Sequence, residues 1–550
     1  MMKPNSYRSI TLFNAIPVEI LECGVIPYLS DLDVFNIIKL CYNYSRQVIK
    51  TPYFKNINIA LTCDIINFVL DTTSVFNGYY NDVQDVNYNT LLHYCETGKQ
   101  TKRLLNSYTL DKKRYVNLKD RLNKTCLHYA ETAEQTRMLI ESKADVNVKE
   151  YYNHNTPLHY SRSTLQTKLL VEAKADVNAV ESFGCATPLH VSFSASQTKI
   201  LLDAKADVNI VDGWGSTPLH ECENADQAKI LIEYKANINS VDFNGSTPLH
   251  KVNNIKHCRV LLSSAGDKVN KLLTTKDNFG GTPLHYTNNL QLCKEFLRSY
   301  KCSLSKFTNF EHVNPLVLIK NYDGRTPLHS AIITPEKTQL LIDEGANIHS
   351  TDNIGNTPLH RAKNLEVIKI LLHSKAFVDS KNIYGNTPLH LAKSTGKVKL
   401  LMSLYNSVNG ISLKKLVNIP NAMGNTPLHI FSIQSYAPLV KIIMKSSLAD
   451  ITIRNSKGHT PLHISRTEEQ TKMMLDNFTG CKKSLILSKD IHGNTPLHYS
   501  KNADQTKILL SYLDNPNEEL SISNDVGHKP FDYATDEDQI VLLSNRYFTW

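Results

Sequence analysis

The chain has 550 residues, of which 41% are hydrophobic and 21% are charged, and its net charge is +9. A single hydrophobic core stops growing at roughly 250–300 residues, so this length predicts either several domains or an array that extends in one dimension. The composition excludes a wholly disordered or collagen-like chain, and the interspersed 61 basic and 52 acidic residues argue against nucleic acid or a membrane as a partner.

The first 80 residues are rich in apolar side chains and predict two or three short helices. Pro17, followed by Glu19, indicates a helix start, because proline is tolerated in the first turn of a helix. Ser30 or Asp31 would cap a second helix. The stretch reads I-P-V-E-I-L at residues 16–21, then Y-L at 28–29, D-L at 31–32 and L-C-Y-N-Y at 40–44.

These stretches resemble the F-box. The resemblance implies that residues 1–59 form a module that recruits a cullin-type ubiquitin ligase through a Skp-type linker. The face that contacts the linker would consist of Leu12, Ile16, Pro17, Ile20, Leu21, Tyr28 and Leu29. The segment departs from the F-box by an extra residue before Tyr28, by Pro27 at a usually helical place and by Tyr44 in place of Trp. The alternative is that residues 10–54 cap an array, with residues 60–83 a linker or cap in either case.

A repeat occupies the rest of the chain. The tetrapeptide TPLH occurs eleven times, starting at Thr156, Thr187, Thr217, Thr247, Thr282, Thr326, Thr357, Thr387, Thr426, Thr460 and Thr495. Degenerate copies start at Thr90, Thr125 and Lys529, and successive copies are 30 to 44 residues apart. These residues resemble the ankyrin repeat. The resemblance implies an all-α solenoid of about 13–14 helix-turn-helix units with short hairpin turns over residues 84–520, with a C-terminal capping repeat at 521–550.

Each residue of the motif has an expected role. The Thr is a good N-cap, and Pro at the next position gives up no needed N–H group. The Leu, as in Leu158 or Leu219, should point into the stack, and the His should reach back to the cap or to the neighbouring turn. A glycine two residues before the Thr should supply a positive φ at Gly215, Gly245, Gly355, Gly385 and Gly493. The first helix should span about two turns.

The second helix is predicted by capping boxes seven residues after the motif Thr. The pairs are Thr97 with Gln100, Thr132 with Gln135, Ser163 with Gln166, Ser194 with Gln197, Asn224 with Gln227, Thr467 with Gln470 and Asn502 with Gln505. After this helix the ankyrin family usually has Gly, whereas this chain has Lys143, Lys174, Lys205, Lys235 and Lys375. Either these helices end differently, or the array tolerates a cost of about 1 kcal/mol for a left-handed Lys.

The residue before the turn glycine is often large and apolar. These residues are Phe183, Trp214, Phe279, Ile354, Tyr384 and Met423, and the column is interrupted at Asn244, Asp323, Lys457 and His492. Turn tips are normally polar, so an exposed apolar row would suit the binding of a target protein. The alternative is that each ring folds onto the adjacent turn.

Other residue types predict structure rather than chemistry. The motif histidines recur once per repeat, about 10 Å apart, whereas zinc ligands must converge at about 2 Å. We therefore expect structural histidines, with no metal and no cofactor. Cys95, Cys126 and Cys222 should pack as small apolar residues, and no known catalytic motif occurs. The stretches 301–317 and 404–417 exceed a repeat, and such inserted loops either serve binding or reflect drift in loop length.

The sequence therefore predicts a monomeric interaction protein, not an enzyme, that captures a target protein and presents it to a ubiquitin ligase. Such arrays joined to F-box-like modules resemble proteins of large DNA viruses, which would place this chain in the host cytoplasm, with the nucleus left open. No run of 18 apolar residues and no apolar signal core occurs, so neither a membrane span nor secretion is expected. The alternatives are a bare scaffold or decoy for a host factor, and an enzyme whose site went unrecognised.

Overall fold

The computed structural model describes residues 87–108, 111–304, 313–332, 334–404, 412–434, 436–514, 519–534 and 536–545. The predicted module 1–59, the segment 60–83 and the whole predicted linker face lie outside these residues; that face is Leu12, Ile16, Pro17, Ile20, Leu21, Tyr28 and Leu29. The chain divides into two compact units, Met1–Phe243 (unit 1) and Asn244–Trp550 (unit 2).

The described part of unit 1 is a row of repeats that share one plan. The TPLH motif forms about one helical turn, and a second helix of nine or ten residues follows it. The elements are η5 (Leu91–Tyr94), α4 (Gly98–Ser107), α5 (Lys112–Val116), η6 (Cys126–Tyr129), α6 (Ala133–Glu141), α7 (Thr164–Glu172), α8 (Ala195–Asp203), α9 (Pro218–Glu221) and α10 (Ala225–Glu233).

Unit 2 continues the same plan with more variation in length. Its elements up to residue 404 are α11 (Pro248–Lys251), α12 (Ile255–Ala265), η7 (Gly266–Lys268), α13 (Val269–Thr274), α14 (Pro283–Tyr286), α15 (Leu290–Leu304), η8 (Pro315–Leu318), α16 (Pro327–Ser330), α17 (Pro335–Asp343), α18 (Pro358–Arg361), α19 (Leu365–His373) and α20 (Thr395–Ser403). The later ones are α21 (Leu413–Val417), α22 (Pro427–Ile433), α23 (Ala437–Lys445), α24 (Glu468–Asp476), α25 (Lys482–Ile486), η10 (Pro496–Tyr499), α26 (Ala503–Leu510), η11 (Pro530–Tyr533) and α28 (Glu537–Asn545).

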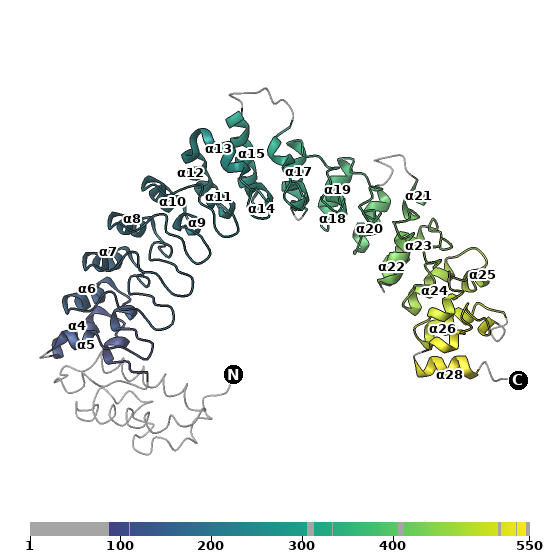
Figure 1. Ribbon diagram of the computed structural model, residues 1–550, viewed down its shortest axis with the longest axis horizontal. Helices are drawn as coiled ribbons and strands as arrows, with labels where there is room; N and C mark the ends of the chain where they lie inside the picture. Colours follow the sequence, from purple (N-terminus) through teal and green to yellow (C-terminus); the bar gives the residue numbers. More distant parts are fainter. Residues whose placement is uncertain are drawn as a thin grey trace, which may run out of the picture. The chain divides into compact units, whose positions relative to one another are not determined.

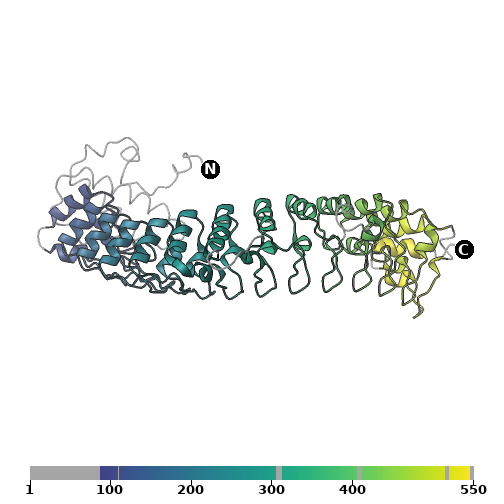
Figure 2. The ribbon, with the colours of Figure 1, turned by 90° about the horizontal axis from the view of Figure 1, so that it is seen from above.

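Within each unit the second helices form one layer and the short first elements form another (Figure 1). The hairpin turns project from one edge of the layers (Figure 2). The parts of the chain that the structure describes contain helices and turns but no β-strand, so the prediction of an all-α solenoid is confirmed. Repeats with extra residues place a short third helix after the second one, as α5, α13, α21 and α25 do.

The two predicted insertions are only partly described. α15 runs to Leu304 and so enters the stretch 301–317, of which residues 305–312 lie outside the description. Of the stretch 404–417, α21 forms the last part, and residues 405–411 are not described.

The first helix is shorter than predicted. α9 has four residues, one turn rather than two, and its C-cap Cys222 is already extended, with φ −66° and ψ 134°. The reason is the position of the next N-cap: Asn224 must be extended to cap α10, and it stands only seven residues after Thr217. A longer first helix occurs at α22, which has seven residues.

The predicted N-caps of the second helices are confirmed. In α10, for example, Asn224 Oδ1 accepts the Gln227 N–H at 2.9 Å, and the other six predicted caps also accept a backbone N–H. In six of these seven boxes the glutamine has a second role that the sequence did not indicate. Gln227 Nε2 donates to Ser192 O of the preceding repeat at 2.6 Å, so the box also joins neighbouring repeats.

Two repeats of unit 2 have a lysine at the position of this glutamine. Lys397 is almost completely buried, and its Nζ donates to the carbonyls of Leu359, His360 and Ala362 at 3.1, 2.9 and 2.9 Å. Burial lowers the pKa of Lys397 to about 7. Lys337 makes the equivalent bonds to two carbonyls, and burial lowers its pKa to about 8.

The second helices end in the left-handed conformation despite the lysine. Lys143, Lys174, Lys205, Lys235 and Lys375 have φ between 68° and 72°. At the end of α10, the N–H groups of Lys235 and Ala236 donate to Ile232 O and Leu231 O, both at 2.9 Å, as a glycine would allow. Of the two alternatives, different helix ends are therefore excluded at these five positions, and the array tolerates the cost of a left-handed Lys.

The core lies between the two helical layers. The motif leucines point inward as predicted, and Leu219 is completely buried in unit 1. In unit 2 a continuous apolar cluster extends from Leu359 to Leu543. The core therefore does not use the turn edge, which is left accessible to other molecules.

Candidate functional site

The repeats begin with a turn in which a side chain accepts hydrogen bonds from backbone N–H groups of the same turn. In the turn at Asp212, Gly215 N–H donates to Asp212 O at 3.0 Å, and Asp212 Oδ1 accepts the N–H groups of Trp214 and Ser216 at 2.9 and 2.8 Å. Gly215 has the predicted positive φ, 79°, and a Cβ there would lie 2.6 Å from the Phe243 ring. Backbone conformation and close packing thus both require glycine at this position.

Successive turns are joined by backbone hydrogen bonds. The donor is the N–H of the residue that directly follows the Asp or Asn at the start of a turn. The acceptor is the carbonyl of the residue that directly precedes the glycine of the turn before it. Such bonds join Phe243 to Trp214 (2.9 Å), Tyr322 to Phe279 (3.0 Å), Ile383 to Ile354 (3.1 Å), Ala422 to Tyr384 (3.0 Å), Ser456 to Met423 (2.9 Å) and Ile491 to Lys457 (3.2 Å). We call this series the turn ladder. It fixes the spacing of the side chains at the turn tips within each unit.

The six side chains predicted as a target-binding row are all exposed, from 40% for Ile354 to 85% for Phe183. The others are Trp214, Phe279, Tyr384 and Met423. In five of these turns the next residue is the glycine with positive φ, but Phe183 differs. The turn at Glu181 has one additional residue, so Cys185 rather than Gly184 takes the positive φ, 52°.

The tip rings also touch the turn before them. The six-membered ring of Trp214 lies so close to Gly184 that a Cβ there would be 2.7 Å from Trp214 Cζ3. The alternative that the rings fold onto adjacent turns is therefore correct in part. Trp214 nevertheless keeps 59% of its surface exposed, so one face of the ring packs and the other is available for contact.

The row has fewer interruptions than the sequence column suggested. Three of the four interrupted turns carry a large apolar side chain one position earlier, and these are Phe243, Tyr322 and Ile491, all more than half exposed. Only the turn at residues 455–458, with Ser456 and Lys457, has no apolar tip among the four. The signal for the missed residues was present in the sequence, but it moves by one position between turns.

The motif histidines form hydrogen bonds within their own turn and to the neighbouring repeat. His360 Nδ1 accepts the Thr357 N–H at 3.1 Å, and His360 Nε2 lies 3.0 Å from Asn386 O in the next turn. The ring must therefore be neutral with its proton on Nε2, and burial lowers the pKa of His360 to about 4. The residues that the structure describes contain no group of three His, Cys, Asp or Glu that could hold a metal ion.

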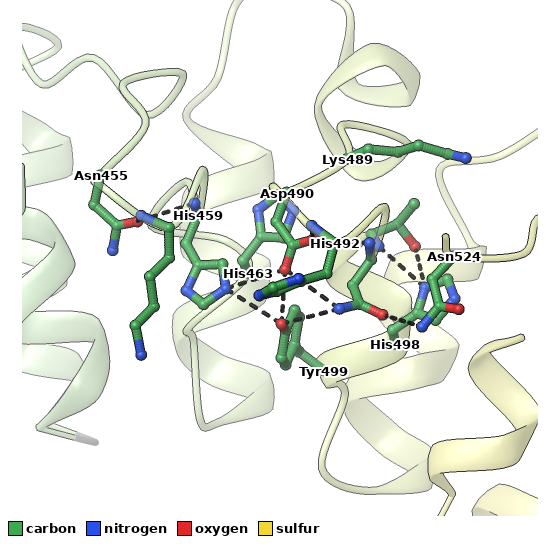
Figure 3. A network of polar contacts seen from close by, with 12 residues as sticks. Asn455, His459, His463, Lys489, Asp490, His492, His498, Tyr499 and Asn524 are labelled. Atoms are coloured by element: carbon green, nitrogen blue, oxygen red, sulfur yellow. Dashed lines mark hydrogen bonds and ion pairs between the residues drawn. The ribbon is translucent and has the colours of Figure 1, made fainter. Parts of the chain in front are cut away.

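A denser polar network surrounds Asp490 in unit 2 (Figure 3). Tyr499 donates to Asp490 Oδ2 at 2.7 Å, and His459 Nε2 lies 3.2 Å from both Asp490 Oδ2 and the Tyr499 hydroxyl. Burial on its own raises the pKa of Asp490, but hydrogen bonds from Tyr499 and from backbone N–H groups outweigh it and lower the pKa to about 2. A tyrosine bonded to its own turn's carboxylate also occurs at Tyr129 with Asp120, without a histidine. Because the same tyrosine–carboxylate hydrogen bond occurs in two repeats, it indicates a structural role for this contact.

The cysteines near the motif behave as predicted. The Cys95 and Cys222 thiols donate to Leu91 O and Leu219 O at 3.5 and 3.4 Å, and burial raises the pKa of each to about 12. Cys126 is buried, and burial likewise raises its pKa. These thiols are therefore protonated at neutral pH, and a protonated thiol is a poor nucleophile.

Comparison with known families agrees with this geometry. The model "Ankyrin repeats (3 copies)" matches residues 193–272, 288–382, 334–412 and 363–455. The chain contains ankyrin repeats. No curated protein matches the sequence.

The ankyrin repeats give this chain a role in protein–protein interaction, and several of their turn tips are among the most exposed large apolar side chains of the described residues. Within the described residues, no helix combines the length and apolar character that a bilayer crossing needs. The family model covers repeats of both units, and it includes the turns of Trp214, Ile354, Tyr384 and Met423.

Proposed function

We propose that the ankyrin repeats capture a target protein through the row of turn tips, with Phe183, Trp214, Phe279, Ile354, Tyr384 and Met423 as contact residues and Phe243, Tyr322 and Ile491 added to them. The observation that supports this proposal is the exposed apolar series on turns that the turn ladder holds in place. Packing on the preceding turn accounts for only part of each ring, because Trp214 keeps 59% of its surface exposed at a position that is normally polar. Aromatic side chains are also enriched among the residues that contribute most to binding.

The test is capture of the target by the full chain and by variants. Trp214→Ser should leave the helical circular dichroism signal unchanged and weaken capture by about 2 kcal/mol, or roughly 30-fold, if Trp214 is a central contact. Leu165→Ser is the matched control, because Leu165 is an exposed apolar residue on α7 rather than on a turn. Equal capture by Trp214→Ser, Tyr384→Ser and the control would contradict the proposal.

We also propose that the N-terminal segment makes this chain an adaptor for a cullin-type ubiquitin ligase. The support comes from the sequence: I-P-V-E-I-L at 16–21 and Y-L at 28–29 are spaced as in an F-box, apart from one extra residue. The corresponding domain boundaries are 1–59, 60–83, 84–520 and 521–550. In this proposal the array selects the target, which residues 1–59 present to the ligase.

The adaptor role is tested by copurification with a Skp-type linker and a cullin. The double change Pro17→Ala with Leu21→Asp should abolish recruitment, because an unpaired carboxylate cannot be buried in an apolar interface. Target capture should be unaffected, because ankyrin units contact only their neighbours. If no linker copurifies with the unmodified chain, the protein is a binding scaffold or a decoy.

A further inference from the structure

Unit 2 has a pocket where the apolar row is interrupted. The pocket has a volume of about 370 Å³ and lies beside the turn at residues 455–458. Met423, Ile433 and Ile464 give it an apolar lining, and Tyr499 and His459 of the polar network form part of its wall (Figure 3). Met423 and Ile433 are 66% and 37% exposed, so apolar surface is available inside it.

The charged side chains of this pocket are all basic. Lys457, Arg466 and Lys501 line it, and among the described residues no Asp or Glu does. All three are exposed, and none forms an ion pair with any residue that the structure describes. Asp490, the carboxylate behind the wall, is buried and already accepts hydrogen bonds from Tyr499 and from the backbone of the turn. The pocket therefore favours an anionic group.

Two of these cations belong to a longer basic stripe. The residue before the N-cap of the second helix is basic and exposed in four repeats of unit 2, at Lys363, Lys393, Arg466 and Lys501. The same position in unit 1 is acidic in three repeats, at Glu96, Glu131 and Glu223. Unit 1 also has one basic residue at this position, Arg162, but it forms an ion pair with Glu131 at 3.0 Å. Among the described residues, a series of basic side chains without an ion pair at this position therefore occurs in unit 2.

We propose that this pocket and the basic stripe bind an extended acidic segment of the target protein. An apolar side chain of the segment would lie against Met423 and Ile433, and carboxylates would pair with Lys457, Arg466 and Lys501. The inference rests on the proposed function and adds the chemistry of the partner. Adjacent repeats are about 10 Å apart and an extended chain advances about 3.3 Å per residue, so an acidic residue about every third position would match the cations of adjacent repeats, such as Arg466 and Lys501.

A protein segment fits these observations better than nucleic acid does. Nucleic-acid affinity at physiological salt comes from many phosphate contacts, and a protein making 6–10 of them is typical. The stripe offers only four cations and is interrupted at Ser435, between Lys393 and Arg466, and exposed apolar tips occur in the neighbouring turns at Tyr384 and Ile491. A mixed surface of this kind complements carboxylates that alternate with apolar side chains.

The experiment measures fluorescence anisotropy of a labelled 12-residue peptide with Glu at every third position and Leu beside each Glu, titrated with the full chain. The triple variant Lys457→Glu, Arg466→Glu, Lys501→Glu should weaken binding by at least about tenfold. Lys441→Glu, on the exposed surface of α23 and away from the pocket, should change it by less than about twofold. Circular dichroism checks that both variants are folded.

Two further peptides separate the contributions. Replacing every Glu by Gln should abolish the difference between the wild type and the triple variant, and replacing every Leu by Ser should weaken binding while retaining that difference. Equal binding by the wild type and the triple variant would overturn the inference. Tighter binding of a 12-nucleotide single strand than of the acidic peptide, lost in the same variant, would overturn it in favour of nucleic acid. Loss of target capture in Trp214→Ser but not in the triple variant would overturn it while leaving the proposed function intact.

Discussion

Acidification is expected to destabilise unit 2, because its motif histidines must be neutral to join the repeats. Burial lowers the pKa of His360 to about 4, whereas an imidazole in the unfolded chain titrates near 6.5. Between these values the unfolded chain binds a proton that the folded chain does not. The stabilisation is therefore complete above about pH 6.5 and is lost as the pH falls towards 4.

The magnitude follows from the number of such rings. At pH 5.5 each ring lowers the free energy of unfolding by about 1.4 kcal/mol, because the pH is then one unit below the pKa of the unfolded imidazole. Burial lowers the pKa to about 4 at six motif histidines of unit 2, which are His285, His329, His360, His390, His429 and His463. If they unfold together, the loss is about 8 kcal/mol, comparable with the whole stability of a domain.

The variant His360→Gln isolates one ring from the other groups that titrate in this range, such as Lys397. A glutamine can still accept the Thr357 N–H, as in a capping box, but it cannot reach Asn386 O in the next turn. The substitution should cost about 1–2 kcal/mol at pH 7.5, and this cost should shrink by about 1.4 kcal/mol at pH 5.5. Urea titrations followed by far-UV circular dichroism at both pH values measure it. An equal cost at the two pH values would refute the reasoning.

Other substitutions test the packing through thermal unfolding. Lys397→Gln should stabilise unit 2 by about 1 kcal/mol, because it removes a buried charge and keeps a donor, whereas Lys397→Met should destabilise it by about 1–3 kcal/mol; the opposite order would contradict the role assigned to its Nζ. Lys375→Gly should raise stability by about 1 kcal/mol, since glycine adopts a positive φ without strain, and a loss would show that the lysine stem packs usefully. Leu219→Ala should cost about 2–5 kcal/mol, and a silent change would mean that the motif leucine does not fill the core. Asn224→Ala should cost about 0.5–2 kcal/mol, while no effect would indicate that water replaces the cap.

The repeat, its caps and its inward leucines could be predicted from the sequence because each depends on neighbouring residues. Thr217 and His220 are three residues apart, and Asn224 and Gln227 are as well, so their hydrogen bonds are local. Contacts between repeats were harder to predict. The bond from Gln227 Nε2 to Ser192 O joins residues 35 apart, and nothing in the local pattern distinguishes it from an ordinary capping box.

In the candidate site, too, some features could be predicted from neighbouring residues and others could not. Trp214 and Tyr384 could be placed at turn tips from the position of the glycine alone. Phe243 and Tyr322 were missed because the apolar residue stands one position earlier in their turns, and only the three-dimensional turn shows that both positions face outward. The left-handed lysines also could not be decided from sequence, because the penalty at Lys235 is offset by hydrogen bonds, one of which comes from Asn209 Nδ2 of the preceding repeat to Lys235 O at 3.3 Å.

The turn ladder has a consequence for the rate at which a partner would bind. Loops that are ordered only on binding slow association, since productive encounters must await the right conformation. Here each tip in the ladder is fixed to its neighbour by a backbone hydrogen bond before any partner arrives. Association should therefore follow a single concentration-dependent phase whose rate constant responds to salt, and substitutions at the tips should act mainly by shortening the lifetime of the complex.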